Sequence, residues 1–328
     1  MLQMAEQESF EYAEVDELGS ITHKDYTDYH IQHVLDLKLV NREAIAKANL
    51  KVVVDAVNSV GGTVIPALLK ALGVREVVEL NCEPTGRFAH NPEPIPENLI
   101  QISEKIKECG ADLGIVVDPD VDRLALVCEN GEMFVEEYTL VAVADYVLKH
   151  TPGNTVSNLS SSRALRDVTL AHGQQYNAAA VGEVNVVTKM KETNTVIGGE
   201  GNGGVIYPES HYGRDALVGV GLFLSHFVAE GKSMTVLKAT YPQYFISKNK
   251  LTLSPDMDVD KILEGLKKKY ASEEITDIDG VKIDFKDGWV HLRKSNTEPI
   301  IRIYSESKDE AAANQLAEEV IKVAQSLY

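Results

Sequence analysis

Short apolar runs alternate with helix-length amphipathic segments from about residue 51 onward. The run Lys51–Asp55 leads into a segment with helical spacing that ends at Leu72-Gly73, and the run Glu76–Leu80 follows. The order strand, helix, strand predicts two parallel strands joined by a crossover helix. The first unit then continues with a helix over 97–109, strands over 113–117 and 124–128, a turn at Asn130-Gly131 into a strand over 132–135, and a helix over 138–149.

A second unit repeats this alternation. It ends in the glycine-rich loop Gly199–Gly204, after which a long apolar segment predicts a helix over 215–229. Because strands and helices again alternate, we expect a mainly parallel sheet. The earlier elements of this unit are expected to be strands over 155–159, 174–179 and 195–198 and helices over 162–172 and 185–192.

The pattern changes beyond a connector over 231–244. Short strands follow, separated by the turn signals Asp279-Gly280 and Asp287-Gly288. Strands clustered between two helices predict an α+β domain with an antiparallel sheet. The flanking elements are expected to be a strand over 246–253 and helices over 258–269 and from about 308.

The predicted fold class is therefore α/β: two α/β/α units with mixed, mainly parallel sheets, followed by a C-terminal α+β domain. A chain of 328 residues is long enough for two or three such domains. We expect the domains to cover 25–152, 153–243 with the connector, and 244–328. Residues 1–24 are acidic and show no period of their own, so we expect them to be a tail or the end of another segment.

Composition excludes several classes of partner. The net charge of −18 disfavours a nucleic-acid or anionic-membrane surface, so local basic clusters must bind any phosphate. Three scattered cysteines, Cys82, Cys109 and Cys128, are typical of reduced core residues. The sequence shows neither a secretory leader nor a membrane-spanning apolar run. We therefore expect a cytoplasmic protein with no nucleic-acid or membrane partner.

Three aspartates follow the predicted strand 113–117 at every second position. Asp118, Asp120 and Asp122 lie around a proline-stiffened turn, so their carboxylates can converge at the carboxyl end of the strand. Like charges at this spacing repel unless a cation neutralises them, which predicts a hard divalent ion such as Mg2+. Arg123 adds a guanidinium beside that ion, where it suits a phosphate. Metal and arginine together indicate phosphoryl chemistry.

Three other interpretations of this loop, residues 118–123, remain open. Aspartates after a strand are often solvated turn residues. A calcium-binding hand fits the spacing of the acids as far as Glu129, although Arg123 stands where that loop needs glycine and the flanks predict strands. A phosphatase with Asp118 as nucleophile fits the strand-Asp-x-Asp order but leaves the two loops described next unexplained.

A second polar loop interrupts two strands of the last domain. The loop Arg293–Pro299 and the following Arg302 bring together two guanidiniums, one ammonium and three hydrogen-bonding side chains, those of Ser295, Asn296 and Thr297. Such a set of donors suits a phosphate dianion. The alternative is a charged hairpin tip.

The third loop, Gly199–Gly204, contains Glu200 and Asn202 among four glycines. Glycines let a backbone approach a ligand closely, and two polar side chains on alternate positions suit adjacent hydroxyls of a sugar. A flexible turn is the alternative. A dinucleotide site is disfavoured because no helix starts in register after the glycines.

These three loops, in this order and spacing, resemble those of the α-D-phosphohexomutases, the family of phosphoglucomutase, phosphomannomutase and phosphoglucosamine mutase. The resemblance covers roughly residues 25–328. It implies three α/β units and a C-terminal α+β unit around a central cleft, with a sugar phosphate as substrate and Mg2+ as cofactor. It also implies a phosphoserine that gives its phosphate to the sugar phosphate and forms a bisphosphate intermediate.

The resemblance assigns the metal loop to phosphoryl transfer. Asp118, Asp120 and Asp122 would hold Mg2+ together with an oxygen of the phosphoserine, and Arg123 would steady the phosphoryl group. These roles are implied by the family and not by the spacing of the residues alone.

The resemblance assigns the other loops to the substrate. Glu200 and Asn202 would hold sugar hydroxyls, and Val181-Gly182-Glu183 matches a further substrate loop to which Gly182 and Lys189 would contribute. The unreactive phosphate would be bound by Arg293, Ser295, Asn296, Thr297 and Arg302.

The chain departs from the family at its start. The phosphoserine belongs to a Ser-His-Asn-Pro-like loop in a first domain that would precede residue 1, and residues 1–24 resemble the exit segment of that domain. Ala89-His90-Asn91-Pro92 has alanine where the serine belongs. We therefore expect residues 1–328 alone to be inactive, with the missing N-terminal domain as a partner.

The glycine loop also bears on the choice of sugar. Residues 201–204 read Gly-Asn-Gly-Gly, a form similar to a branch usually called phosphoglucosamine mutase. Glucosamine phosphate is therefore the expected substrate. The alternatives are phosphomannomutase/phosphoglucomutase and a non-catalytic sugar-phosphate-binding protein.

Overall fold

The first sheet has the strand order β2-β1-β3-β4, in a computed structural model that describes residues 2–253, 257–295 and 298–327. β4 is antiparallel to β3, and the other neighbouring strands are parallel. β3 and β4 are buried along their whole length, as continuous apolar runs of a sheet covered on both faces are expected to be. The strands are β1 (Lys51–Asp55), β2 (Glu76–Leu80), β3 (Leu113–Val117) and β4 (Leu124–Cys128).

Helices cover both faces of this sheet. α4 shares an apolar cluster with Val52, Val54 and Ile115, whereas α5 shares another cluster with Val53 and Val116. Two helices that the hydrophobic pattern did not predict, α2 and α3, pack beside α4 and contact α9 (Ala216–Glu230) of the next unit. The helices are α2 (Thr27–Leu35), α3 (Arg42–Lys47), α4 (Gly61–Leu72) and α5 (Ile100–Cys109).

One predicted strand of this unit does not form. The turn at Asn130-Gly131 is present, and the backbone N–H of Cys128 donates to Glu132 O (2.8 Å). The prediction of a strand over 132–135 is wrong: among the described residues, the backbone of 132–135 makes only an isolated bridge, at Met133.

The second sheet has the strand order β6-β5-β7-β8, with β8 antiparallel to β7 and the other pairs parallel. α9 is buried from Ala216 to Phe227 and contacts β4 of the first sheet as well as β8 of the second. The two units therefore share one continuous apolar core. The elements are β5 (Thr155–Asn158), β6 (Tyr176–Ala179), β7 (Ile197–Glu200), β8 (Gly204–Ile206), α6 (Glu136–His150), α7 (Arg163–Ala171), α8 (Glu183–Glu192) and α9 (Ala216–Glu230).

The third sheet is entirely antiparallel, in the order β10-β11-β12-β13-β9. Val290 and Leu292 on β12 pack with α11 and α12, whereas His291 between them reaches Ser160 of the second unit. The predicted α+β domain is confirmed. Its elements are β9 (Phe245–Thr252), α11 (Val259–Lys269), β10 (Glu274–Thr276), β11 (Val281–Phe285), β12 (Gly288–Lys294), β13 (Ile300–Ser307) and α12 (Glu310–Gln325).

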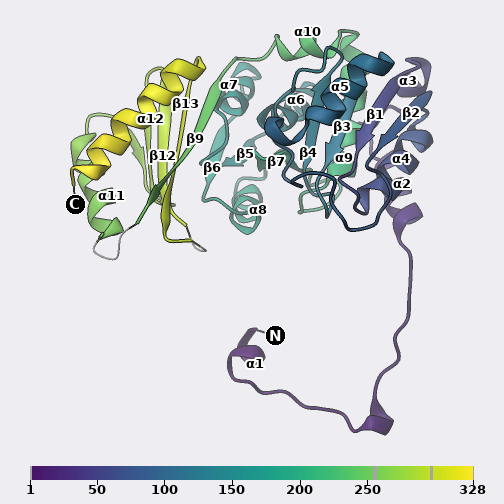
Figure 1. The fold of residues 1–328 in the computed structure, drawn as a ribbon, viewed down its shortest axis with the longest axis horizontal. Coiled ribbons are helices and arrows are strands. Elements are labelled where there is room, and N and C mark those ends of the chain that lie inside the picture. Colours follow the sequence, from purple (N-terminus) through teal and green to yellow (C-terminus); the bar gives the residue numbers. More distant parts are fainter. Residues whose placement is uncertain (1, 254–256, 296–297, 328) are drawn as a thin grey trace.

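The segment before α2 lies apart from the three units. Residues 3–26 are exposed throughout, and Figure 1 shows them running away from the body of the molecule. No helix among the described residues is both long enough and apolar enough to cross a membrane. The remaining short helices are α1 (Leu2–Glu6), η1 (Val15–Glu17), η2 (Pro96–Asn98) and α10 (Met234–Lys238).

Buried polar contacts join the second and third units. Arg163 at the start of α7 donates from Nη2 to Asp284 Oδ1 (2.8 Å) and to Gly288 O (2.8 Å). Its backbone N–H donates to Glu306 Oε1 (3.0 Å). His291 adds a contact across the interface, with Nδ1 2.8 Å from the hydroxyl of Ser160, while its Nε2 lies 2.7 Å from the backbone oxygen of Asp279 in its own unit. These contacts hold the third sheet against the second.

The buried histidine at this interface predicts a loss of stability in acid. His291 is 1% exposed, and burial lowers its pKa from 6.5 to about 4. Between pH 6.5 and pH 4 the unfolded chain binds a proton at His291 that the folded protein does not. The contribution of neutral His291 to the free energy of unfolding is therefore complete above pH 6.5 and is lost as the pH falls toward 4. The free energy of unfolding is expected to fall by roughly 2 kcal/mol between pH 7 and pH 5 from this group. Urea denaturation at the two pH values measures the loss.

Two variants identify the group responsible. His291→Gln is expected to reduce the pH dependence, whereas His23→Gln, in the exposed N-terminal segment, is expected to leave it intact. Part of the dependence remains in the first variant, because burial also lowers the pKa of His226 to about 4. Equal pH dependence in the His291 variant and the wild type would contradict this assignment.

Candidate functional site

The end of β3 brings the three predicted aspartates together. Asp118 is 6% exposed, and its Oδ1 accepts hydrogen bonds from the backbone N–H groups of Asp122 (3.1 Å) and Arg123 (3.0 Å). These bonds fold the loop back on itself, and Val121 takes a φ of 61°, which a β-branched residue rarely adopts. One carboxylate oxygen from each of Asp118, Asp120 and Asp122 lies within 4.8 Å of the others. The predicted convergence of the three carboxylates is therefore present.

This carboxylate cluster has the properties of a cation site. Burial, together with the charges of Asp122 and Asp120, raises the pKa of Asp118 to about 7, and burial also raises the pKa of Asp122. Asp122 Oδ1 is buried and has no hydrogen-bond partner among the described residues. A hard divalent cation bound by these carboxylates would offset both the burial and the repulsion that raise their pKa values. The donor set fits Mg2+, and the strands β3 and β4 on either side of the loop argue against a calcium-binding hand.

Arg123 joins this cluster to the second unit. Its Nε lies 3.5 Å from Asp118 Oδ2 and 3.7 Å from Asp122 Oδ1. Its backbone forms an isolated bridge with Gly204, and the N–H of Leu124 donates to the backbone oxygen of Gly203 (3.0 Å). The edges of the two sheets therefore meet at the point where the metal loop and the glycine loop leave them.

The glycines of the loop 199–204 allow this close packing. A Cβ on Gly201 would lie 1.9 Å from Glu137 Oε2, and a Cβ on Gly203, whose φ is +91°, would lie 2.5 Å from Leu124 O. A Cβ on Gly204 would meet the side chain of Arg214 at 2.4 Å. These glycines were predicted to admit a ligand, but the space that a Cβ would take at these three positions is filled by Glu137, Leu124 and Arg214.

Glu200 is held from several sides. It is 4% exposed, and its Oε1 accepts hydrogen bonds from Asn158 Nδ2 (2.8 Å) and from the backbone N–H of Gly182 (3.2 Å). Its Oε2 accepts a hydrogen bond from Arg214 Nη1 (3.0 Å). Glu200 and Asn202 both line a cavity of about 190 Å³.

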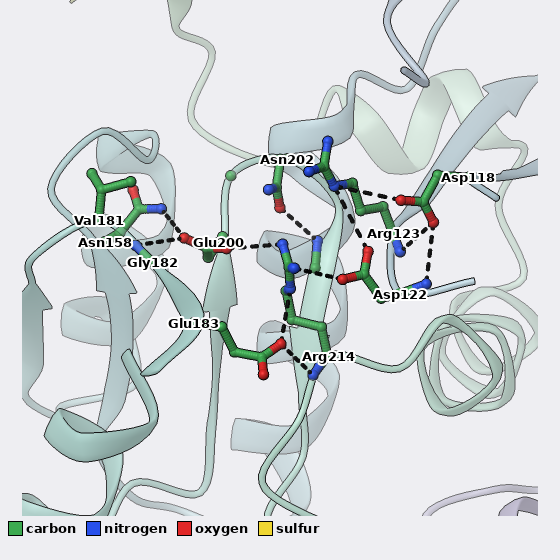
Figure 2. Close-up of polar contacts among 12 residues, drawn as sticks. Asp118, Asp122, Arg123, Asn158, Val181, Gly182, Glu183, Glu200, Asn202 and Arg214 are labelled. Carbon is green, nitrogen blue, oxygen red and sulfur yellow. Dashed lines mark hydrogen bonds and ion pairs between the residues drawn. The ribbon is translucent and has the colours of Figure 1, made fainter. Parts of the chain in front are cut away.

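Arg214, which the sequence analysis missed, lies between the metal loop and the glycine loop (Figure 2). Its Nη2 is 2.5 Å from Asp122 Oδ2, its Nη1 is 3.0 Å from Glu200 Oε2, and its Nε is 3.0 Å from Glu183 Oε2. The one signal in the sequence is the neighbouring Asp215, which caps the N-terminus of α9. That signal locates the start of a helix but does not indicate what the preceding side chain reaches.

Two arginines of the phosphate loop stand opposite each other. Arg293 on β12 is paired in register with Arg302 on β13. Like charges in this position destabilise a sheet unless anions neutralise them, and here Arg293 pairs with Asp279 (3.4 Å) and Arg302 with Glu298 (3.4 Å). Both line the cavity that contains Glu200, and the Nε atoms of Arg302 and Arg123 are buried without a hydrogen-bond partner among the described residues. The arrangement suits a bound phosphate.

The cavity connects the loops of three units. Val181 N–H donates to Asp279 Oδ2 (3.0 Å), and Arg293 Nη1 donates to the same oxygen (3.4 Å). The further substrate loop therefore touches the third unit directly. The residues that line the cavity are Glu93, Arg123, Glu137, Asn158, Ser160, Val181, Glu200, Gly201, Asn202, Lys248, Arg293, Arg302 and Tyr304.

Two predicted residues, Lys189 and Ser295, are not among the described residues that line this cavity. Lys189 lies further along α8, where its Nζ pairs with Glu192 Oε2 (2.7 Å), and it is not among the described residues that line the cavity. Ser295 is 6% exposed, and its hydroxyl accepts a hydrogen bond from a backbone N–H in its own loop. Asn296 and Thr297 lie outside the described residues. Their predicted contact with phosphate stays a prediction.

Models of three successive protein domains match the sequence. They are described as phosphoglucomutase/phosphomannomutase α/β/α domain II, over residues 25–131, α/β/α domain III, over 136–244, and C-terminal domain, over 251–323. The matched ranges group the helix α6 with the second unit, whereas the hydrophobic pattern grouped it with the first.

Individual relatives agree with these matches. The chain is 38% identical over 96% of its length to a phosphoglucomutase/phosphomannomutase of Thermococcus kodakarensis and covers 69% of that protein. It is 33% identical over 88% of its length to a phosphoglucosamine/phosphogalactosamine mutase of Sulfurisphaera tokodaii and covers 64% of it. A crystal structure of a phosphoglucomutase/phosphomannomutase family protein from Burkholderia thailandensis superposes with a TM-score of 0.83 at 28% identity, covering 99% of this chain and 69% of that one. The chain thus spans about two thirds of the length of these proteins.

Proposed function

Because the chain belongs to the phosphoglucomutase/phosphomannomutase family, we propose that it takes part in the interconversion of hexose 6-phosphate and hexose 1-phosphate through a bisphosphate intermediate. The relatives compared above are named as mutases, which are isomerases. The observation that carries the proposal is the cavity that Arg123 of the metal loop shares with Arg293 and Arg302 of the phosphate loop. A sugar with a phosphate at each end needs cationic groups at both ends of its site.

The metal loop is proposed to serve the phosphate that is transferred. Asp118, Asp120 and Asp122 would hold Mg2+, which when bound offsets negative charge on a phosphoryl group. Arg123 lines the cavity beside these aspartates and would donate to the same group.

The opposite wall is proposed to hold the phosphate that does not react. Arg293 and Arg302 would bind it, and Glu200 and Asn202 between the two ends would contact sugar hydroxyls. The intermediate carries two phosphates, so each end of the site must accept either of them. Positioning and charge stabilisation are the contributions that phosphoryl transfer requires of a protein.

Calorimetry with glucosamine 6-phosphate tests this assignment of the phosphate loop. Residues 1–328 are expected to bind the sugar phosphate weakly, and Arg293→Ala is expected to lower the affinity about tenfold or more, because a charge-assisted pair is lost. Arg42→Ala is the matched control: Arg42 is exposed at the start of α3 and is not among the described residues that line the cavity. Full affinity in the Arg293 variant, or equal losses in both, would contradict the proposal.

For the sugar we propose glucosamine, on the Gly-Asn-Gly-Gly sequence of residues 201–204. Mannose or glucose is the second candidate, favoured by the 38% identity to a protein named phosphoglucomutase/phosphomannomutase. Titration of the chain with glucosamine, mannose and glucose 6-phosphates compares the three directly. Tighter binding of mannose 6-phosphate or glucose 6-phosphate would replace the first candidate by the second.

We also propose that residues 1–328 alone do not complete a turnover. The resemblance assigns the phosphoserine to a segment outside these residues, and none of the serines within them matches its motif. A coupled assay with the purified polypeptide 1–328 is expected to show no isomerisation. Robust turnover would show that a group within these residues accepts and returns the phosphate.

A further inference from the structure

Among the residues drawn in Figure 2, Arg214 is the one whose side chain contacts both the metal loop and the glycine loop. It is held by three carboxylates from three different segments: Asp122 after β3, Glu200 at the end of β7, and Glu183 at the start of α8. Its side chain is 16% exposed. A single guanidinium shared by three acids can redistribute among them when the charge on one of them changes.

The backbone of Arg214 is fixed, so only its side chain can respond. Its neighbour Asp215 caps α9 through the N–H groups of Leu217 (2.8 Å) and Val218 (3.1 Å), and the N–H of Asp215 donates to Val205 O (3.0 Å). The stem of the arginine lies over Gly204, where a Cβ would meet its Cδ at 2.4 Å. The guanidinium therefore pivots about a fixed stem.

From this arrangement we propose that Arg214 couples metal binding to sugar-phosphate binding by competing with the cation for Asp122. The inference rests on the proposed function, since it requires a cation at the aspartates and a sugar phosphate beside Glu200. Without the cation, the guanidinium neutralises Asp122. With the cation bound, two positive charges would share one carboxylate, and their repulsion weakens the contact between Arg214 and Asp122.

The released guanidinium remains attached to its other two partners. Glu183 Oε2 accepts from both the Nε (3.0 Å) and the backbone N–H (3.2 Å) of Arg214, so this carboxylate holds the stem in place. Once its contact with Asp122 weakens, the guanidinium of Arg214 pairs more strongly with Glu200, which lines the cavity. Cation binding thus fixes Glu200 more firmly in the position from which it contacts a sugar. By reciprocity, sugar-phosphate binding raises the affinity for the cation by the same factor.

The proposal predicts that two substitutions change metal affinity in opposite directions. Arg214→Met removes the competing charge, so MgCl2 is expected to bind residues 1–328 about tenfold more tightly than in the wild type. Glu183→Gln removes an anchor on the other side, so the guanidinium shifts toward Asp122 and MgCl2 is expected to bind several-fold more weakly. A residue with a purely structural role would give weaker or unchanged metal binding when removed.

Isothermal titration with MgCl2, in the presence and absence of glucosamine 6-phosphate, measures both effects. In the wild type the sugar phosphate is expected to tighten metal binding, and in Arg214→Met this enhancement is expected to disappear. Lys191→Met is the control for a general loss of positive charge, because Lys191 stacks on Tyr212 nearby and contacts none of the three acids. It is expected to reproduce neither change.

The outcomes separate this inference from the function on which it rests. If the wild type binds MgCl2 and Arg214→Met binds it equally or more weakly while its thermal unfolding is unchanged, the coupling is refuted and the metal site stands. If Arg214→Met does not fold, the MgCl2 affinities of Glu183→Gln and Arg214→Lys test the coupling in its place. Wild-type affinity in both of these variants refutes the coupling. If the wild type binds neither MgCl2 nor glucosamine 6-phosphate, the proposed function fails first.

Discussion

Replacement of Asp120 by asparagine is expected to weaken Mg2+ binding by residues 1–328 about 100-fold. Removing a group that only hydrogen-bonds a metal ligand lowers metal affinity about 10- to 100-fold, and the loss of a charged ligand itself should reach the upper end of that range. Asp120 is the exposed member of the three aspartates. Asp118 also accepts two backbone hydrogen bonds and Asp122 also pairs with Arg214, so a change at either would disturb the loop as well as the ligand set. Asp120→Asn removes one charged oxygen ligand and leaves those contacts in place.

Isothermal titration of the wild type and the variant with MgCl2 measures the change. Asp260→Asn, an identical substitution at an exposed position on α11, is the matched control and is expected to bind as the wild type does. Thermal unfolding of both variants without metal is expected to match the wild type within a degree or two, because neither side chain is buried. Wild-type affinity in Asp120→Asn would remove the metal site, whatever the other loops bind.

The metal loop was predictable because its geometry is local. Three acids at alternate positions after a buried strand can converge whatever surrounds them, and Asp118, Asp120 and Asp122 do so. The arginine pair of the phosphate loop was predictable for a similar reason, since Arg293 and Arg302 flank one hairpin connection and face each other across it. Sequence distance within each motif is short, so secondary structure alone places the side chains.

Arg214 was not predictable in this way. Its three partners belong to segments that meet only when the edge strands of the two sheets are joined, and the sequence does not show that β4 and β8 form that junction. The glycines of the loop 199–204 were recognised but given a different role, because the residues that pack against them, Leu124 on β4 and Glu137 on α6, are distant in sequence.

One error has a local cause. The prediction of a strand over 132–135 is wrong because a turn signal fixes only the reversal of the chain, whereas a strand also needs a partner along its whole length. The role of Lys189, which the resemblance implies together with that of Gly182, stays a prediction. Lys189 follows that glycine by about two turns of α8 and pairs with Glu192.

The third unit is expected to lose about 3–5 kcal/mol of stability when Arg163 is replaced by methionine. Arg163 is 8% exposed, and its Nη2 donates to Asp284 Oδ1 (2.8 Å) and Gly288 O (2.8 Å) in the third sheet. Methionine fills much of the same volume but donates nothing, so a carboxylate and a carbonyl at the interface are left without their partner. Trp289, the single tryptophan, is buried in the same sheet, where its Nε1 donates to Glu306 Oε1 (2.7 Å).

Urea denaturation followed by tryptophan fluorescence therefore reports directly on this interface. Arg166→Met is the matched control: Arg166 lies on the same helix, its side chain is 35% exposed, and its Nη1 is 4.0 Å from the same Asp284 carboxylate. A partly exposed pair at this distance contributes about 0–1 kcal/mol, so the control is expected to shift the midpoint little. Similar shifts in the two variants would mean that the buried fork of Arg163 does not hold the third sheet to the second. In that case the cavity between the phosphate loop and the glycine loop would depend for its shape on the smaller contacts of His291 with Ser160 and of Asp279 with Val181.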